Sequence, residues 1–318
     1  MESKNRKPYR GYVYIAIATF LWGTAATIGR AAFTGHLLPG GRSLPPFDPL
    51  AFSQSRTTFS FLILLPILFA ARGVRRLHLP VADFWRIFLL GILGMAASNY
   101  FYYLAIQKTN VATAIVVQYT APIWVLLYVA VRQLQKPTLA RLAAVVLALA
   151  GIALAIGVIG GHGLRLDRIG VIAALLAAFS FAFYNIAGHD ILTNYDHWIV
   201  LLYTVFSASV FWIVVNPPWK IVAAHYSGAQ WLFLLGFALI SMLIPFAFYF
   251  AGLKYLEPTR AIVVSCLEPV FAILIAAIAL GEVLRWPQII GILLVLGAIV
   301  LVQMPDPKQP VPIIEPVD

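Results

Sequence analysis

Long apolar stretches alternate with short polar segments along almost the whole chain. Each stretch has roughly the 20 residues that an α-helix needs to cross the hydrocarbon layer of a bilayer. The intervening segments combine proline, glycine and charge, which favour turns. The pattern therefore predicts an all-α integral membrane protein with ten transmembrane helices. They are expected at about residues 11–33, 48–71, 82–105, 110–131, 138–159, 168–190, 196–215, 229–252, 258–280 and 285–303.

The composition excludes an ordinary soluble domain. Apolar residues make up 62% of the 318-residue chain and charged residues only 11%, whereas a soluble domain has about a quarter charged residues. Most of the surface must therefore face lipid, so the bilayer is the first partner that the sequence predicts. The proline-rich segment 304–318 is expected to be a disordered tail outside the membrane.

The net charge of +10 comes from 22 Lys and Arg residues that lie mainly between the apolar stretches. This placement argues against a nucleic-acid partner, because no single basic face is formed. If the N-terminus is cytoplasmic, 14 of these cations fall on the cytoplasmic side and 7 on the other side, with Arg56 inside the second stretch. Cytoplasmic loops carry an excess of Lys and Arg, so both termini are predicted to be cytoplasmic.

A repeat links the two halves of the chain. The tetrapeptide Ala114–Val117 recurs as Ala261–Val264, and the shift of 147 residues also pairs Pro122 with Pro269. Chance similarity between apolar segments is the alternative explanation. A shared tetrapeptide followed by a proline at the same spacing favours a duplication.

The repeat predicts two blocks of five helices, residues 1–160 and residues 161–303, which we call the first half and the second half. The same shift pairs Tyr102 with Tyr249. Because five is odd, the second block enters the membrane from the opposite side. Such inverted repeats are the architecture of many secondary carriers, whose substrate sites lie near mid-membrane between the halves.

Several short motifs occur in a fixed order along the chain. They are Leu21-Trp22-Gly23-Thr24, Arg56, Pro122, Leu267–Ala272, Gly281-Glu282, Ile290-Gly291 and Gly297. Together they resemble the drug/metabolite transporter superfamily, specifically its ten-span EamA-type members, over residues 10 to 303. One position departs from that pattern. In the first repeat of the family, an acidic residue often occupies the position equivalent to Glu282. Here that position is Gln135, so a role that depends on this acid is not expected in the first half.

The resemblance implies a secondary transporter of a bacterial inner membrane that exports small organic metabolites by alternating access. It also implies a central cavity lined by spans one to four and six to nine, with spans five and ten at the periphery. By overall similarity, without a diagnostic motif, the chain resembles the YddG-type aromatic amino acid exporters. The expected solute is therefore amino-acid-like, with an aromatic or apolar side chain.

Polar side chains inside the apolar stretches are the candidate binding residues, because a polar group in lipid without a partner costs several kcal/mol. Arg56 and Glu268 are the charged residues far from a predicted helix end. Arg56 could neutralise a substrate carboxylate, and Glu268 could contact an ammonium group or carry a proton. The alternative for both is a structural role between helices.

Neutral and aromatic residues complete the predicted substrate site. Amide side chains suit the two ends of a zwitterion, and aromatic rings suit a flat apolar side chain. The alternatives are hydrogen bonding between helices and anchoring at the membrane interface. The neutral and aromatic candidates are Trp22, Asn99, Gln118, Tyr119, Tyr184 and Asn185. Pro122 and Pro269 are predicted to act as hinges for rocking between the halves.

An intramembrane enzyme is the less favoured class. The chain has no His-Glu-x-x-His and no Gly-x-Ser-x-Gly motif, and its six histidines are scattered. No phosphate-binding loop is present either, which argues against direct use of ATP. We therefore predict no enzymatic activity and no metal or other cofactor. A channel or facilitator remains an alternative to a carrier, and the oligomeric state is left open, with a monomer compatible with the sequence.

Overall fold

The computed structural model describes residues 8–34, 47–73, 77–132, 138–158, 166–280 and 283–304. Within these residues every regular element is helical, and no strand is present. The first-half helices are α1 (Pro8–Thr34), α2 (Pro49–Arg72), α3 (Val81–Leu89), η2 (Leu90–Ala96), α4 (Ala97–Lys108), α5 (Val111–Gln118), α6 (Ala121–Val131) and α7 (Leu139–Ala155). The second-half helices are α8 (Arg168–Leu192), α9 (His197–Val215), α10 (Pro218–Ala223), α11 (Gly228–Ala238), η3 (Leu239–Leu243), α12 (Ile244–Leu253), α13 (Pro258–Ser265), α14 (Leu267–Leu280) and α15 (Trp286–Gln303).

Nine helical segments of the described chain are long and apolar enough to cross a membrane. Four of them combine consecutive elements, as in α3–η2–α4, which is continuous from Val81 to Lys108. Helix α7 is apolar but has only 17 residues. The predicted all-helical membrane fold is confirmed, and the tenth crossing, at α7, stays a prediction. The motif Gly281-Glu282, Gln135 and the tail after residue 304 lie outside the described residues.

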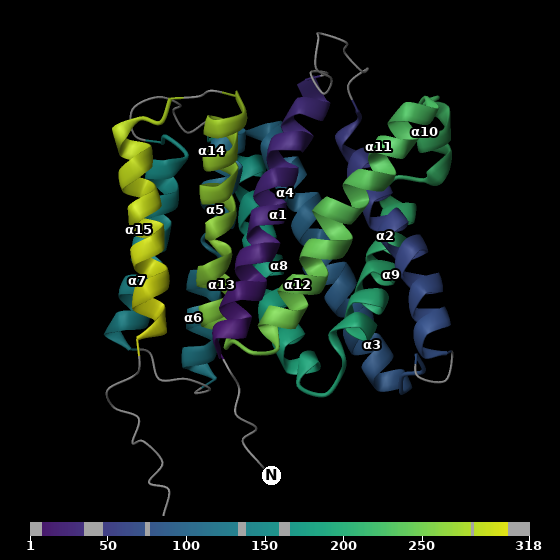
Figure 1. The fold of residues 1–318 in the computed structure, drawn as a ribbon, viewed down its shortest axis with the longest axis horizontal. Helices are drawn as coiled ribbons and strands as arrows, with labels where there is room; N and C mark the ends of the chain where they lie inside the picture. Colours follow the sequence, from purple (N-terminus) through teal and green to yellow (C-terminus); the bar gives the residue numbers. More distant parts are fainter. Residues whose placement is uncertain are drawn as a thin grey trace, which may run out of the picture.

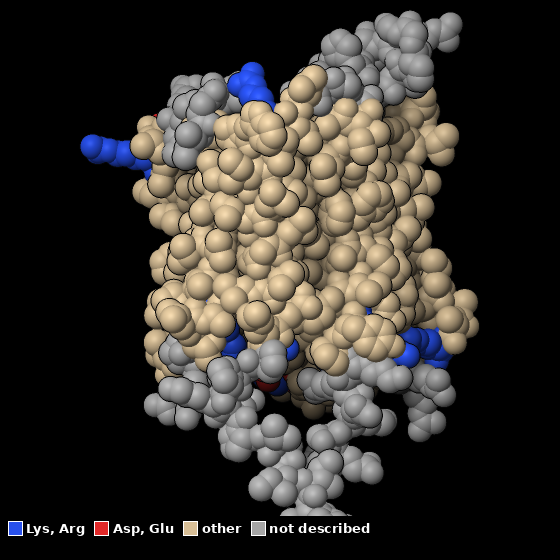
Figure 2. Space-filling view, turned by 60° about the vertical axis from the view of Figure 1, so that its left-hand side comes forward, with Lys and Arg blue, Asp and Glu red and all other residues tan. Residues whose placement is uncertain are grey.

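The helices stand side by side, as Figure 1 shows, with α7 and α15 paired at one edge of the bundle. Helix α1 begins and α15 ends at the same end of the bundle, the lower end in Figure 1. A broad belt without charged side chains crosses the face seen in Figure 2, and Lys and Arg side chains lie at its two margins. An apolar belt between two polar margins is what a bilayer requires of a spanning protein.

Two π-helical segments, η2 and η3, interrupt otherwise continuous transmembrane helices. Such segments frequently lie at functional sites. In η2, the absence of a side chain at Gly94 permits a close approach to α8, because a Cβ there would lie 3.1 Å from the Cβ of Tyr184. The π-helical turn therefore lies against a predicted site residue.

Two other transmembrane segments are broken just before a proline. Helix α5 ends at Gln118, and α6 begins at Ala121 with Pro122 in its first turn. Helix α13 ends at Ser265, and Pro269 lies in the first turn of α14. Proline is tolerated in a first helical turn, where its missing N–H would have no partner in any case. The predicted hinge prolines therefore lie next to real interruptions of the helices.

The two halves are packed into each other through α1 and α8. Helix α1 packs on α12, α13 and α14 of the second half, and α8 packs on α4, α5 and α6 of the first half. Gly23 permits the contact between α1 and α14, because a Cβ there would lie 2.8 Å from the backbone nitrogen of Ala272. This close packing fixes the backbone that follows Glu268 against the middle of α1.

Candidate functional site

The interior charges are held by partners from neighbouring helices. Arg56 on α2 and Glu268 on α14 are both partly buried. The Nη2 atom of Arg56 donates to Oδ1 of Asn99 on α4 at 2.5 Å. The hydroxyl of Tyr119 donates to Oε2 of Glu268 at 2.9 Å. Because Glu268 also lies within electrostatic range of Arg56, the two opposite charges belong to one interior cluster.

The local structure explains how Tyr119 and Glu268 meet. Tyr119 caps the C-terminus of α5 at the break before α6, and Glu268 lies one residue into α14 after the corresponding break. Both side chains therefore project from interrupted helices, where the backbone turns away from the regular helical path. Their bond joins the first half to the second half, across 149 residues of sequence.

Arg56 has unused hydrogen-bonding capacity. Its Nε atom is buried and has no hydrogen-bond partner among the described residues. Asn99, in contrast, uses its amide nitrogen to donate to the backbone oxygen of Met95 at 2.7 Å, which directs its oxygen toward Arg56. A guanidinium with a free N–H group can donate to a further oxygen, such as that of a carboxylate.

An aromatic cluster adjoins these charges. Trp22 on α1 packs against Tyr249 on α12, with ring centroids 5.1 Å apart. Tyr184 on α8 stacks on Tyr249 and on Phe250, with centroids 6.2 and 5.2 Å apart. The Tyr184 hydroxyl is buried without a partner in the described part of the chain. Rings from both halves therefore form one continuous apolar wall.

Asn185 is fully buried, and both ends of its amide are paired. The Tyr249 hydroxyl donates to its Oδ1 atom at 2.5 Å, and its Nδ2 atom donates to the backbone oxygen of Phe181 at 2.8 Å. In this conformation the side chain forms a bond between α8 and α12, which is the structural alternative that the sequence left open. A substrate role for Asn185 would need this bond to open and stays a prediction.

Gln118 connects to the same region through α4. Its amide nitrogen lies 3.4 Å from the hydroxyl of Ser98, which donates to the backbone oxygen of Ala177 on α8. Ser98 precedes Asn99, the partner of Arg56. The structure therefore brings the eight predicted binding residues into one interior region, and their contact with a substrate stays a prediction.

Tyr249 and Tyr102 belong to this region but were not among the predicted binding residues. Both lie within electrostatic range of Glu268, and Tyr249 also contacts Trp22, Tyr184 and Asn185. A signal was present, because the repeat shift pairs these two tyrosines. Their neighbourhood in space depends on helix packing and is not visible in the sequence.

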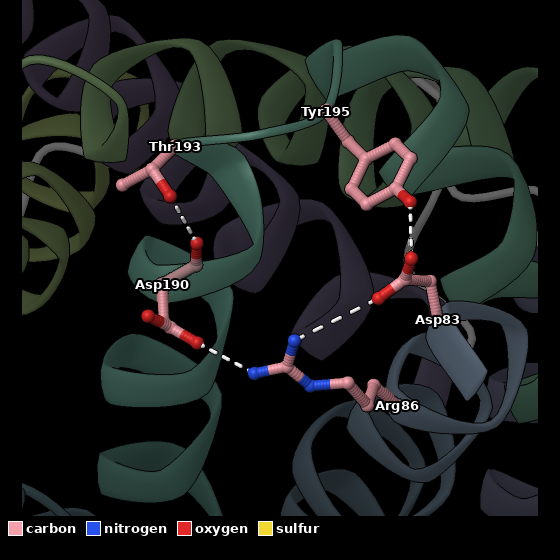
Figure 3. Close-up of polar contacts among 5 residues, drawn as sticks. All are labelled: Asp83, Arg86, Asp190, Thr193 and Tyr195. Carbon is pink, nitrogen blue, oxygen red and sulfur yellow. Dashed lines mark hydrogen bonds and ion pairs between the residues drawn. The ribbon is translucent and has the colours of Figure 1, made fainter. Parts of the chain in front are cut away.

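A second polar network lies at the end of the bundle where α1 begins. Figure 3 shows Arg86 of α3 between the carboxylates of Asp83 and Asp190. Its distances to these carboxylates are 3.7 and 2.9 Å. The Tyr195 hydroxyl donates to Asp83 at 2.5 Å, and this bond raises the pKa of Tyr195 above its usual value. The turn between α8 and α9 is therefore attached to α3.

Further ion pairs join the halves at this same end. Arg72 at the end of α2 contacts Asp196 at 2.7 Å, and Arg141 of α7 contacts Glu257 at 3.1 Å. Burial alone would raise the pKa of Asp196, but the bond from Arg72 and nearby positive charge hold it below its usual value. The five ion pairs between arginines and acidic side chains of the described residues all lie at this end, as does the 3.6 Å contact between His197 and Asp196.

Two cavities accompany these features. One of about 570 Å³ lies between α1, α2, α9 and α12, with Leu64 and Phe248 on its apolar wall and Asp196 and Lys254 at its polar end. A groove of about 870 Å³ lies between α2, α3 and α9 and is lined mainly by apolar and aromatic side chains. Neither is lined by a predicted binding residue, so the interior cluster is packed rather than open to these two spaces.

An apolar belt around helices that enclose opposite charges defines a multi-pass membrane protein with a polar interior. A sequence profile of the EamA-like transporter family matches the chain twice, over residues 9–157 and 168–304. The chain therefore belongs to the EamA-like transporter family, and its function is that of a membrane transporter. The family expectation drawn from the motifs is confirmed at this level.

Similar proteins agree with this assignment. The chain is 22% identical over 303 residues to the uncharacterized inner membrane transporter YicL of Salmonella typhimurium, covering 94% of this chain and 97% of YicL. It is 25% identical to an uncharacterized transporter of Archaeoglobus fulgidus, over 88% of this chain and 96% of that one. A crystal structure of a protein with 21% sequence identity superposes with a TM-score of 0.73, covering 92% of this chain and 96% of that chain, and shows the fold alone.

Proposed function

We propose that the protein is a secondary carrier that exports amino-acid-like solutes, preferably with aromatic or apolar side chains, across a bacterial inner membrane. The observation that carries this proposal is the interior cluster, in which Arg56 and Glu268 lie within electrostatic range of each other beside an aromatic wall. A zwitterion presents a carboxylate to the guanidinium and an ammonium group to the carboxylate. Its side chain would lie against rings such as Trp22 and Tyr249.

Matching irregularities support a fold of ten spans in two inverted repeats. The cap of α5 at Tyr119 and the cap of α13 at Cys266 are 147 residues apart, which is the repeat shift. At the same shift, η2 ends at Ala96 and η3 ends at Leu243. Two kinds of helix interruption therefore recur at equivalent positions. We infer that α7 is the tenth span, equivalent to α15, with which it is paired.

Helix packing agrees with this repeat. Helix α1 contacts α12 near Gly252, and α8 contacts α4 near Thr109. Both contacts join the first span of one half to the third span of the other half. An arrangement of this kind allows the halves to exchange conformations and so to expose a mid-membrane site alternately on each side. Alternating access about the helix breaks at Pro122 and Pro269 is the mechanism that we infer.

The proposal is tested by counterflow in proteoliposomes loaded with unlabelled phenylalanine. We expect saturable uptake of labelled phenylalanine that tryptophan inhibits more strongly than lysine or glutamate. Arg56→Gln and Glu268→Gln should each reduce this counterflow at least about tenfold, because each removes a buried charged bond to the substrate. Arg132→Gln, which changes an exposed cation at the end of α6, is the matched control and should transport normally.

The outcomes separate the alternatives. Counterflow of another metabolite without any response to aromatic amino acids would support the carrier mechanism but refute the proposed substrate class. Unsaturable flux with an electrical conductance would indicate a channel and refute the carrier. Unchanged counterflow in both charge variants would refute the assignment of the interior cluster as the binding site.

A further inference from the structure

The short turn between α8 and α9 is attached to the first half by several polar bonds. Asp190, at the end of α8, pairs with Arg86, and Tyr195 in the turn donates to Asp83. Asp196, which caps α9, pairs with Arg72. Figure 3 shows that the α3 side chains face this turn directly. The partners are separated by 104 to 124 residues in sequence, so the bonds bring distant spans together.

Described contacts between the halves at the opposite end have a different chemistry. There, Asn216 donates to Gln54 at 2.8 Å, and Gln288 donates to the backbone oxygen of Ala155 at 3.4 Å. Both are neutral, and none of the ion pairs between described residues lies at that end. Among the described residues, the halves are therefore joined by ion pairs only at the end where α1 begins.

The exposure of the charged groups makes their bonds suitable for opening. The side chains of Arg86 and Asp190 are 57% and 65% exposed, and those of Arg72 and Asp196 are 28% and 36% exposed. Exposed ion pairs contribute little individually because water replaces the partner at small cost. Several of them together can bias a two-state equilibrium while still allowing it to reverse within a transport cycle.

We propose that Asp83, Arg86, Asp190 and Tyr195, together with Arg72 and Asp196, form a clasp that holds the transport pathway closed at the end where α1 begins. This inference rests on the proposed carrier mechanism and deepens it, because it assigns the closed side and the residues that keep it closed. Arg86 is the central member. Its planar guanidinium contacts carboxylates from both halves at once, a geometry that lysine reproduces only in part.

The clasp lies between the interior cluster and the end of the bundle where α1 begins. Tyr184, which stacks on Tyr249, lies six residues, or fewer than two helical turns, before Asp190 on α8, and Ala187 lies midway between them. Opening the clasp would let water reach this segment of α8 from the end where α1 begins. Residue 187 therefore offers a reporter position on the path from that end to the binding residues.

The test measures the accessibility of a cysteine at this position. The reporter Ala187→Cys is placed in a Cys266→Ala background, and membrane vesicles that expose the α1 end are treated with a membrane-impermeant thiol reagent. We expect Arg86→Ala and Asp190→Asn each to raise the modification rate roughly three- to tenfold, since each breaks the pair that joins the halves. Arg86→Lys should give a smaller increase, and the double variant should add little to either single change.

Arg132→Ala is the matched control. Arg132 is an exposed cation at the same end that forms no ion pair with the described residues, so its loss should leave the modification rate unchanged. An equal rise in this control would overturn the clasp, because it would reflect general loosening. Thermal melting of each variant identifies any loss of folding, and Asp190→Asn and Arg86→Lys serve if Arg86→Ala does not fold.

The clasp and the carrier proposal fail in different ways. Unchanged modification in both Arg86→Ala and Asp190→Asn, in protein that still shows counterflow, would refute the clasp alone. Faster modification in these variants, in a protein that shows no counterflow of any solute, would support the clasp and refute the carrier. Modification that rises together with altered counterflow would support both.

Discussion

Tyr119 and Glu268 lie in opposite halves and form a hydrogen bond with each other. The sequence pattern predicted both as binding residues but did not predict that they are in contact. We predict that Tyr119→Phe keeps the packing of the ring but removes the 2.9 Å bond to the carboxylate. The bond holds the Glu268 carboxylate that we propose to contact the substrate ammonium group. Its loss should therefore lower transport affinity by at most the about 1.5–3 kcal/mol that a hydrogen bond to a charged group contributes, which is roughly a ten- to hundredfold change. The measurement is the substrate dependence of counterflow.

A matched change on the next helix controls for the general effect of losing a tyrosine hydroxyl. Tyr128 lies on α6, and its side chain is 40% exposed. Tyr128→Phe should leave the affinity unchanged within about twofold. If both variants behave alike, the bond between Tyr119 and Glu268 has no part in substrate binding.

The sequence predicted the burial of individual polar residues better than it predicted their partners. The cost of polar groups in lipid identified Arg56, Asn99 and Glu268 as interior residues, and all three form interior bonds. The same reasoning could not rank Tyr249, because tyrosine is common in this chain and also suits membrane interfaces. Only the packing of α8 against α12 shows that the Tyr249 hydroxyl donates a hydrogen bond to the amide oxygen of Asn185.

At the scale of elements, glycine determines how closely helices approach. Gly151 of α7 lies against Gly291 of α15, where a Cβ on Gly151 would be 2.7 Å from the backbone oxygen of Gly291. Gly297, also on α15, has open space around it. We predict that Gly291→Ala destabilises the protein by about 1–3 kcal/mol through backbone overpacking. Gly297→Ala should be neutral or slightly stabilising, because alanine favours the helix.

Thermal unfolding of the two variants in detergent checks this prediction, and the pair differs only in the position of one methyl group along the same helix. Since α7 and α15 carry none of the predicted binding residues, the substrate preference of both variants should remain that of the parent. Equal stability of the two variants would show that the contact between α7 and α15 tolerates a side chain at position 291.

The helix boundaries illustrate the strengths and limits of the sequence pattern. The predicted apolar stretch at residues 82–105 corresponds to a continuous helix from Val81 to Lys108, because stretch length reflects the thickness of the bilayer. The interruptions at η2 and η3 were not predicted. A π-helical turn responds to packing, as between Gly94 and Tyr184, and leaves no distinct apolar period in the sequence.

At the scale of the whole molecule, the ends of the bundle differ in charge and should face different compartments. Lys220 lies in α10, at the end opposite to the start of α1, and Arg132 lies at the end where α1 begins. Both are exposed. We predict that, in a Cys266→Ala background, Lys220→Cys reacts with a membrane-impermeant thiol reagent in intact cells and Arg132→Cys does not.

Inside-out vesicles provide the reciprocal measurement, in which Arg132→Cys should react and Lys220→Cys should be protected. The reason is the excess of cations on the cytoplasmic side. Reaction of both cysteines from one side would place the two ends of the bundle in a single compartment and would refute the predicted orientation together with the inverted repeat.

The sequence by itself determined the membrane class, most of the helices, the family and the set of interior polar residues. These follow from local rules, because each helix must satisfy its own backbone in lipid and must be long enough to cross it. The tertiary structure alone decided which residues pair, as Arg86 with Asp190 and Tyr249 with Asn185. Such pairs depend on the rotation, tilt and separation of helices that lie far apart in the chain, and no local pattern of residues encodes those quantities.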